Sequence, residues 1–412
     1  MSRAVAFGDA PDDWRTRAVD AIPGGCSTGS KRPIALYGTR AADPGVPSHY
    51  DRAEGCRVWS TDGRRFVDCG MALGAVGIGY ADPAVTRAVQ EAAAQGNVSS
   101  LPHRLEVEVA EALIEVIPSA EQVRFLRTGA EATAAAVRIA RAVTGRERLI
   151  ACGYFGWFDW SSDAVGVPAS VREAVTWVPF NDVPALEAAL DAGELPAAII
   201  IEPLVHEVAG DAWLTAARRG ADRVGAVLIF DEIKTAFRVR TGGVQALTGI
   251  VPDLSTIGKA LANGYPLAAV VGRAAVMDAA TQTWISSTAA AETTGLAAAR
   301  AVLAWHDQVD VCGRMAASGA QLRTIIGAAL VDAPWVGVCA EGPPVMWRLT
   351  ADLPERLDAL VAAAARHGIL LKRGAYQFGA GAHDEAAFAD IAQALPVVVD
   401  ALRPELQRMG DP

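Results

Sequence analysis

The sequence predicts an α/β fold in which a mainly parallel sheet is accompanied by a smaller α+β unit. Short, continuous apolar runs recur from about residue 122, and helical stretches separate most of them at roughly the spacing of a crossover unit. Continuous apolar runs are typical of parallel strands that are covered on both faces. The chain of 412 residues also exceeds the ~250–300 residues at which a single core stops growing, so we expect two packed domains.

The N-terminal part predicts an irregular arm that leads into a hairpin. Residues 1–60 are rich in Pro, Gly and charge, and a short strand is predicted near residues 56–59. The turn Thr-Asp-Gly-Arg at 61–64 joins this strand to a second one at 66–68, which is typical of a β-hairpin.

Two helices and six strands are predicted next. A helix over residues 83–95 has Asp82 as its N-cap and Gly96 just beyond its end, the usual signals for a helix start and stop. A second helix over residues 105–116 carries apolar residues at helical spacing. The predicted strands are residues 123–126, 149–151, 176–178, 198–201, 227–230 and 268–271.

The residues that follow a long helix near 295–305 predict the smaller unit. The elements expected there are a strand at 345–348, a helix at 354–366, a strand at 369–371 and a helix that begins near Asp384. We expect the domains to be an N-terminal arm with part of the small domain (1–60), a large domain (61–305) and a C-terminal small domain (306–412).

Composition argues against several classes of protein. Apolar residues make up 51% of the chain and charged residues 20%, as in ordinary globular proteins. The net charge of −10 without a basic stripe argues against a nucleic-acid partner. No apolar run reaches the length of a membrane span. The six scattered cysteines and the absence of a signal peptide predict a cytoplasmic protein with reduced thiols and no metal site.

Asp231 and Lys259 form the most informative pair in the chain. Asp231 ends the apolar run Val-Leu-Ile-Phe-Asp, and Lys259 follows 28 residues later in Ser-Thr-Ile-Gly-Lys. A carboxylate at the buried end of a strand is costly unless a cation lies beside it, and an amine among small apolar residues is neutral and nucleophilic more readily. Pyridoxal phosphate (PLP) requires such an acid for its ring nitrogen and such an amine for its aldehyde.

Two further segments suit the same cofactor. Thr128, Gly129 and Ala130 follow a predicted strand and open a helix, where free N–H groups and the helix dipole favour a phosphate. On this segment alone a plain strand-to-helix turn is the commoner explanation, but Asp231 and Lys259 reverse that preference. Tyr154, just after another predicted strand, could stack on a flat ring.

Several nearby residues have a structural and a functional interpretation. Ile233 could cover the opposite face of the ring, although on its own a core position is the better interpretation. Glu202, at another strand end, could position a water, the ring hydroxyl or an arginine, or could form a structural salt bridge. For the aromatic residues Trp157, Phe158 and Trp160, core packing and a role in the substrate pocket are equally favoured.

Taken together, these motifs resemble the class III (fold-type I) PLP-dependent aminotransferases, and in particular the branch around glutamate-1-semialdehyde aminomutase. The likeness extends over nearly the whole chain, from Ile-Pro-Gly-Gly at 22–25 through Asp-Gly at 62–63 and Thr-Gly-Arg at 144–146 to residues 379–384. The family fold implies a seven-stranded, mainly parallel sheet in a large PLP-binding domain and a smaller α+β domain.

The resemblance also implies roles for individual residues. Lys259 would form the internal Schiff base and then move the α-proton, while Asp231 would keep the ring nitrogen protonated. Thr128, Gly129 and Ala130 match the phosphate-binding turn, and Tyr154 matches the stacking aromatic. Thr288, in Ser-Ser-Thr at 286–288, matches the threonine that reaches the phosphate of the neighbouring subunit's cofactor, which implies a homodimer with shared active sites.

The chain departs from the family pattern at three places. Phe155 stands where the family commonly has His, and Ala236 stands where Gly is usual. Residues 289–293 read Ala-Ala-Ala-Glu-Thr rather than the common Gly-Asn-Pro. None of these changes touches Lys259 or Asp231, so they predict an altered substrate with the same cofactor.

We expect an aminotransferase that moves an amino group from an amino donor to an aldehyde or keto acceptor of biosynthetic metabolism, through an amine form of the cofactor. A 1,2-aminomutase or an amino-acid racemase would use the same residues, and a catalytically silent binding protein would have lost Lys259 or Asp231. Arg32, Lys31 and Arg373 are candidates for binding a substrate carboxylate.

Overall fold

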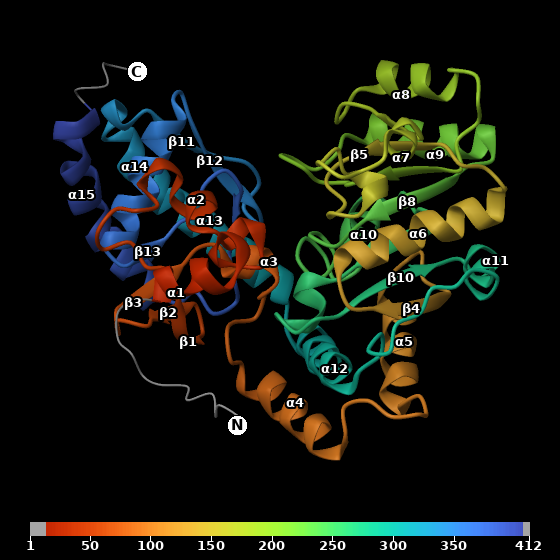
Figure 1. Ribbon diagram of the computed structural model, residues 1–412, viewed down its shortest axis with the longest axis horizontal. Helices are drawn as coiled ribbons and strands as arrows, with labels where there is room; N and C mark the ends of the chain where they lie inside the picture. The colour runs from red at the N-terminus through yellow and green to blue at the C-terminus, as the bar shows by residue number, and fades with distance from the viewer. Residues whose placement is uncertain (1–13, 407–412) are drawn as a thin grey trace. The chain divides into compact units, whose positions relative to one another are not determined.

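The computed structural model of the protein describes residues 14–406, and the chain folds into two compact units (Figure 1). The large unit spans Ala72–Ala317, and the small unit combines the described residues up to Met71 with those from Ser318 onward. The boundaries fall within α3 (Met71–Gly74) and α13 (Val311–Val331). Each unit has a sheet and helices of its own.

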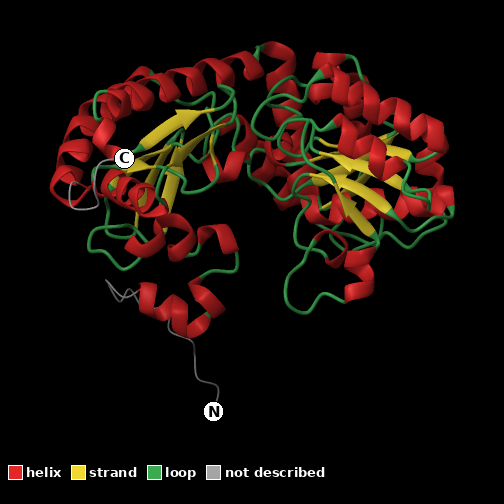
Figure 2. Cartoon of the chain, turned by 90° about the horizontal axis from the view of Figure 1, so that it is seen from above, coloured by secondary structure: helices red, strands yellow, loops and turns green. Residues whose placement is uncertain are grey.

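A seven-stranded sheet in the order β4-β10-β9-β8-β7-β5-β6 forms the centre of the large unit (Figure 2). Strand β10 pairs antiparallel with both β4 and β9, whereas the other pairs are parallel. The predicted α/β fold with a mainly parallel sheet is therefore confirmed. The strands are β4 (Gln122–Leu126), β5 (Leu149–Cys152), β6 (Val175–Trp177), β7 (Ala198–Ile201), β8 (Val227–Asp231), β9 (Leu254–Ile257) and β10 (Ala268–Gly272).

Two clusters of buried apolar side chains cover the two faces of this sheet. Along β10, Ala268 and Val270 belong to one cluster, while Ala269 and Val271 belong to the other, because successive side chains of a strand point to opposite faces. Helix α6 contributes to the first cluster, and helices α5 and α12 contribute to the second. This arrangement explains why β5, β7 and β10 carry no polar side chains.

Helix ends in the large unit follow ordinary capping chemistry. Asp82 accepts hydrogen bonds of 3.0 Å from the N–H groups of Ala84 and Val85, as the sequence predicts for an N-cap. The helices are α4 (Pro83–Gln95), α5 (Arg104–Val116), α6 (Gly129–Thr144), α7 (Ala169–Glu173), α8 (Val183–Leu190), α9 (Asp211–Val224), α10 (Gly243–Thr248), α11 (Ala274–Met277) and α12 (Thr293–Gln308).

The small unit contains two sheets, in the orders β1-β2-β3-β13 and β11-β12-β14. The predicted hairpin is present: β2 and β3 are antiparallel, and Gly63 in their turn has a φ of 82°, which suits glycine. The strands are β1 (Tyr50–Glu54), β2 (Arg57–Ser60), β3 (Arg65–Asp68), β11 (Val338–Glu341), β12 (Trp347–Ala351), β13 (Ile369–Leu370) and β14 (Tyr376–Gln377). The helices are α1 (Trp14–Ala21), α2 (Pro33–Tyr37), α14 (Pro354–Arg366) and α15 (Glu385–Leu406).

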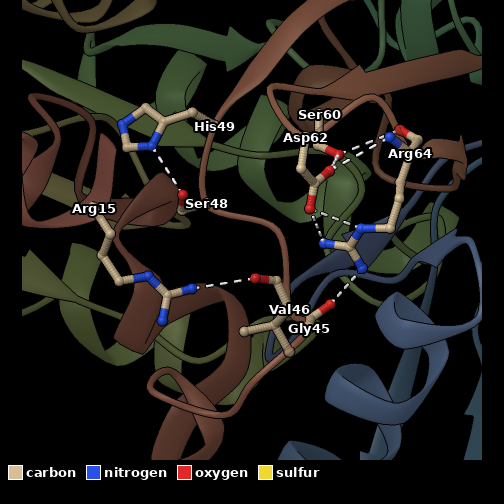
Figure 3. Close-up of polar contacts among 8 residues, drawn as sticks. All are labelled: Arg15, Gly45, Val46, Ser48, His49, Ser60, Asp62 and Arg64. Carbon is tan, nitrogen blue, oxygen red and sulfur yellow. Dashed lines mark hydrogen bonds and ion pairs between the residues drawn. The ribbon is translucent and has the colours of Figure 1, made fainter. Parts of the chain in front are cut away.

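The N-terminal arm has more structure than its composition predicts, since it includes α1, α2 and β1. The irregular stretch before β1 is held by side chains (Figure 3). Arg15 donates a 3.2 Å hydrogen bond to the Val46 carbonyl, and Arg64, which pairs with Asp62 in the hairpin turn, donates one of 2.6 Å to the Gly45 carbonyl. Among the helices of residues 14–406, none is long and apolar enough to cross a membrane.

Candidate active site

Nearly all the candidate residues lie at one edge of the large sheet. The strands β4, β5, β7, β8 and β9 run in the same direction, so their carboxyl ends lie at the same edge. Ligands of open α/β sheets bind at this edge. The residues that follow these five strands are Thr128 after β4, Tyr154 after β5, Glu202 after β7 and Lys259 after β9, while Asp231 ends β8.

Asp231 is a buried carboxylate with one oxygen in use. Its Oδ1 accepts hydrogen bonds of 3.0 Å from the Ile233 N–H and from the Thr256 hydroxyl. Within residues 14–406, the hydrogen bonds to Asp231 all reach this oxygen and leave Oδ2 as an open acceptor. Burial, and next the negative charge of Glu202, raises the pKa of Asp231 well above the usual range of an aspartate. A cation at Oδ2 would therefore stabilise the ionised form.

Lys259 presents its amine to the same group of charges. It follows Gly258 at the end of β9 and has a φ of 47°, a strained backbone conformation that is typical of functional positions. Burial, and next the positive charge of Lys234, lowers the pKa of Lys259 to about 8, although Asp231 and Glu202 act in the opposite direction. A substantial fraction of this amine is therefore neutral near physiological pH.

The turn before α6 offers backbone N–H groups. Thr128 and Glu131 form a capping box in which the Thr128 hydroxyl accepts from the Glu131 N–H at 3.3 Å. The first N–H groups of a helix have no partner within it, so those of Gly129 and Ala130 can bind an anion together with the helix dipole. The residues thus fit the phosphate group of PLP.

Three glycines allow the segments of this edge to approach each other closely. A Cβ placed on Gly129 would lie 2.7 Å from the Cδ1 of Ile233, and one on Gly156 would lie 2.5 Å from the Cβ of Ala130. A Cβ on Gly153 would lie 2.5 Å from the Cγ of Glu202. These contacts join the turn before α6, the segment after β5 and the loops after β7 and β8.

Glu202 uses both of its carboxylate oxygens. Oε2 accepts a 3.1 Å hydrogen bond from the Tyr154 N–H, and Oε1 forms an ion pair of 2.6 Å with the Lys234 ammonium. Of the interpretations open for Glu202, the structure favours a salt bridge, with a partner that sequence reasoning missed. The available signal was a lysine three residues after Asp231, because the loops after neighbouring strands β7 and β8 must lie close together.

The aromatic segment after β5 divides into a packed and an exposed part. Phe155 is buried and stacks on Trp160 and on Trp177, with ring centroids 5.5 and 6.1 Å apart. Core packing therefore accounts for Phe155 and Trp160. Trp157 is 73% exposed and contacts Phe158 edge to face, and Tyr154 is 71% exposed. The side chains of Trp157 and Tyr154 remain available for ligands or for a partner subunit, whereas Phe158 is partly buried against the core.

Thr288 stands apart from the other candidates. It lies in an exposed loop before α12, and no hydrogen bond or ion pair within residues 14–406 joins it to them. The unusual Glu292 that follows caps α12 by accepting from the Thr294 and Gly295 N–H groups. It also pairs with Arg127 at 2.5 Å, which ties this segment to the turn at Thr128. Sequence reasoning missed this pair as well.

The candidate carboxylate-binding residues belong to the small unit. Arg373 is held in an ion pair with the buried Asp358, which also accepts from the Thr39 N–H and hydroxyl. Arg32 and Lys31 are exposed. No cluster of three or more His, Cys, Asp or Glu residues within the described chain could hold a metal ion.

Comparisons with known proteins agree with this geometry. The family model for class III aminotransferases matches residues 39–157 and 178–374. Glutamate-1-semialdehyde 2,1-aminomutase of Symbiobacterium thermophilum is 34% identical over 87% of this chain and 79% of its own. The 2'-deamino-2'-hydroxyneamine transaminase of Streptomyces kanamyceticus is 36% identical over 80% of this chain and 86% of its own.

A solved structure shares the fold. The PLP internal aldimine form of FumI from Sphingopyxis sp. MTA144 superposes with a TM-score of 0.89 at 28% identity, over 96% of this chain and 97% of that one. The fold-type I assignment and the cofactor PLP are thereby confirmed. The chain belongs to the class III aminotransferases, and it is a PLP-dependent enzyme that transfers an amino group or moves it within a molecule.

Proposed function

We propose that this enzyme is a transaminase that takes an amino group from an amino donor and delivers it to a separate aldehyde or keto acceptor, with Lys259 and Asp231 as its central residues. The observation that supports this most directly is the pairing of an open, buried Asp231 oxygen with a partly neutral Lys259 amine at one sheet edge. The similarity to a transaminase at 36% identity also supports transfer between two substrates.

Pyridoxal phosphate supplies an aldehyde that captures amines and a ring that withdraws electrons from the adjoining carbon. Lys259 would hold the cofactor covalently through Nζ, and its amine, when free, would take a proton from one carbon and deliver it to another. Asp231 would accept a hydrogen bond from the ring nitrogen through its open Oδ2, and its negative charge would keep a proton on that nitrogen.

The remaining residues orient the cofactor. The N–H groups of Gly129 and Ala130 would bind the phosphate, together with the Thr128 hydroxyl. Tyr154 would stack on one face of the ring, and Ile233 would cover the other. Glu202 fixes the backbone of Tyr154 through its 3.1 Å hydrogen bond.

We further propose a cytoplasmic homodimer in which Thr288 reaches the phosphate of the neighbouring subunit's cofactor. Two features support this assembly: the exposed loop that carries Thr288, and the exposure of Trp284 in the same loop. The six cysteines are free, which suits a reducing compartment. In the proposed domain division, the expected PLP-binding domain of residues 61–305 corresponds to the large unit, which spans Ala72–Ala317, and the expected segments 1–60 and 306–412 correspond to the small unit. Light scattering coupled to size exclusion would measure the assembly.

A spectroscopic half-reaction tests the transaminase proposal. Addition of an amino donor alone should remove the visible band of the loaded protein, and a carbonyl acceptor added later should restore it. Lys259→Ala should show neither change. Turnover of a single substrate without an acceptor would contradict the proposal.

A 1,2-aminomutase is the second candidate, because the relative with 34% identity carries that name. Such an enzyme would convert one amino-carbonyl compound into its isomer without a separate acceptor. Isotopic labelling of the substrate nitrogen distinguishes the two: label recovered in a newly aminated acceptor indicates a transaminase, and label recovered in the isomer of the substrate, with no acceptor added, indicates an aminomutase.

A further inference from the structure

Lys234 and Glu202 form an ion pair that is almost entirely removed from solvent. Their side chains are 12% and 4% exposed, and the Nζ–Oε1 distance is 2.6 Å. An ion pair on the surface contributes little to stability. In a buried pair such as this one, removing one partner leaves the other as an uncompensated charge. The pair comes from two neighbouring strand ends and lies beside the residues that are proposed to hold the cofactor.

The negative charge of Glu202 acts on several neighbouring groups, and the positive charge of Lys234 compensates it. These groups are Asp231, Lys259 and the buried thiol of Cys152. Two neighbouring carboxylates in a buried site tend to share one proton, and a proton retained by Asp231 would prevent that residue from stabilising a cationic ring nitrogen. Glu202 also has a structural role, because its other oxygen accepts the hydrogen bond from the Tyr154 N–H.

Lys234 is also placed to act on the reactive amine. The charged groups that act on Lys259 are Lys234, Asp231, Glu202 and Arg238. Lys234 opposes a positive charge on Lys259 and Glu202 favours it, so the two charges of the intact pair act against each other at that position. The loss of either partner would leave the opposite charge acting alone.

We propose that Lys234 is a positioning residue for the reaction, whose ammonium holds Glu202 as a compensated anion so that the Asp231 carboxylate is left to pair with the cofactor's ring nitrogen. This inference rests on the function proposed above, because it assumes that the cofactor is attached to Lys259 beside Asp231. It explains why a lysine occupies a loop position that is only partly exposed.

The test is a pH titration of the visible band of the loaded protein, which reports the protonation of the nitrogen that joins Lys259 to the cofactor. Lys234→Gln removes a like charge and should raise the titration midpoint. Glu202→Gln removes an opposite charge and should lower it. Each shift should be on the order of one pH unit. The double variant Lys234→Gln/Glu202→Gln should return to within a fraction of a unit of the wild-type midpoint.

Two controls separate this role from a structural one. Lys234→Arg keeps the charge and should keep the wild-type midpoint. Arg223→Gln breaks an exposed ion pair with Glu187 and Asp191 in the same unit and should also leave it unchanged. Shifts of the two single variants in the same direction, or none in either, would overturn the role of Lys234.

The proposed function can fail separately from this inference. If the wild-type protein shows no visible band with PLP, or if Lys259→Ala keeps the band unchanged, the attachment to Lys259 is wrong. If the band depends on Lys259 but its midpoint ignores Lys234 and Glu202, only the positioning role is wrong. If Glu202→Gln fails to fold, Lys234→Gln and Lys234→Arg still test the inference. A midpoint that is lowered or unchanged in Lys234→Gln, while Lys234→Arg keeps the wild-type midpoint, would contradict it.

Discussion

Two lysines, one in each unit, have a pKa of about 8 but different surroundings. Burial is the main cause in both: with the charge of Lys234 it lowers the pKa of Lys259 to about 8, and with the charge of Arg373 it lowers the pKa of Lys372 to about 8. The ammonium of Lys372 donates to the backbone carbonyls of Ser30 and Ala35. The amine of Lys259 donates no hydrogen bond within residues 14–406.

A lowered pKa alone therefore does not identify a nucleophilic lysine. The backbone of Lys372 is held as firmly as its side chain: its N–H donates to the Gln377 amide oxygen at 2.8 Å, and its carbonyl accepts from the same side chain at 2.7 Å. These bonds give Lys372 a structural role in joining the N-terminal arm to the end of β13. Lys259 instead faces carboxylates at a ligand-binding edge.

The largest expected effect separates the two lysines directly. Lys259→Ala should abolish the covalent visible band and reduce turnover by on the order of 10³-fold or more, because it removes both the attachment point and the proton carrier. Lys372→Met should retain the band. Absorbance spectra and initial rates of both variants provide the measurement, and a Lys259→Ala protein with near-normal turnover would refute the distinction.

The next prediction compares the adjacent carboxylates of Asp231 and Glu232, which also differ in how their oxygens are hydrogen-bonded. Glu232 is fully buried and accepts hydrogen bonds from the Val244 and Gln245 N–H groups at 2.9 and 3.0 Å, whereas Asp231 has an open oxygen. Asp231→Asn should therefore reduce turnover by on the order of 10²-fold with little change in melting temperature. Glu232→Gln should mainly lower the melting temperature. The reverse pattern, measured by rates and thermal melts, would show that Asp231 is structural.

The pH dependence of cofactor loading tests whether the neutral amine of Lys259 is the form that reacts. Below pH 8 the neutral fraction of an amine with this pKa rises about tenfold per pH unit, and above pH 8 it levels off. The rate at which cofactor-free protein gains its visible band should follow this curve between pH 6 and 9. Lys372→Met should give the same curve. A shifted curve in that variant would show that Lys372 also affects cofactor loading.

The smallest expected effect concerns stability. Lys372→Met leaves two carbonyls without their donor and should lower the free energy of unfolding by about 1–3 kcal/mol. The unfolded chain keeps this proton up to the ordinary pKa of 10.5, whereas the folded chain releases it near 8. Between these pH values the unfolded state binds more protons, so the contribution of Lys372 to stability rises with pH. Urea unfolding at pH 7 and pH 10 should show the larger loss at pH 10.

The sequence predicted the features that depend on local chemistry. The helix α4 has the expected bounds because Asp82, Pro83 and Gly96 act on their immediate neighbours. The direction of β10 was not predicted, since an apolar run reads the same in either direction. The short connection from β9 to β10, residues 258–267, was the available signal, because a parallel crossover requires a dozen or more residues.

Pairs between loops were the other features that sequence reasoning missed. Lys234 meets Glu202 because β7 and β8 are neighbours in the sheet, and Arg127 meets Glu292 because the turn after β4 lies near the start of α12. Neither relation follows from spacing along the chain. Asp231 and Lys259 could be identified in advance because the chemistry of one cofactor links them without any knowledge of strand order.

The close contacts of Gly129, Gly153 and Gly156 have a consequence for protein engineering. A methyl group at position 153 or 156 would collide with Glu202 or with the backbone of Ala130, and one at 129 would displace Ile233. Libraries that aim at new acceptors should therefore leave these three positions untouched. The ring of Trp157, which is 73% exposed, is the better position to vary.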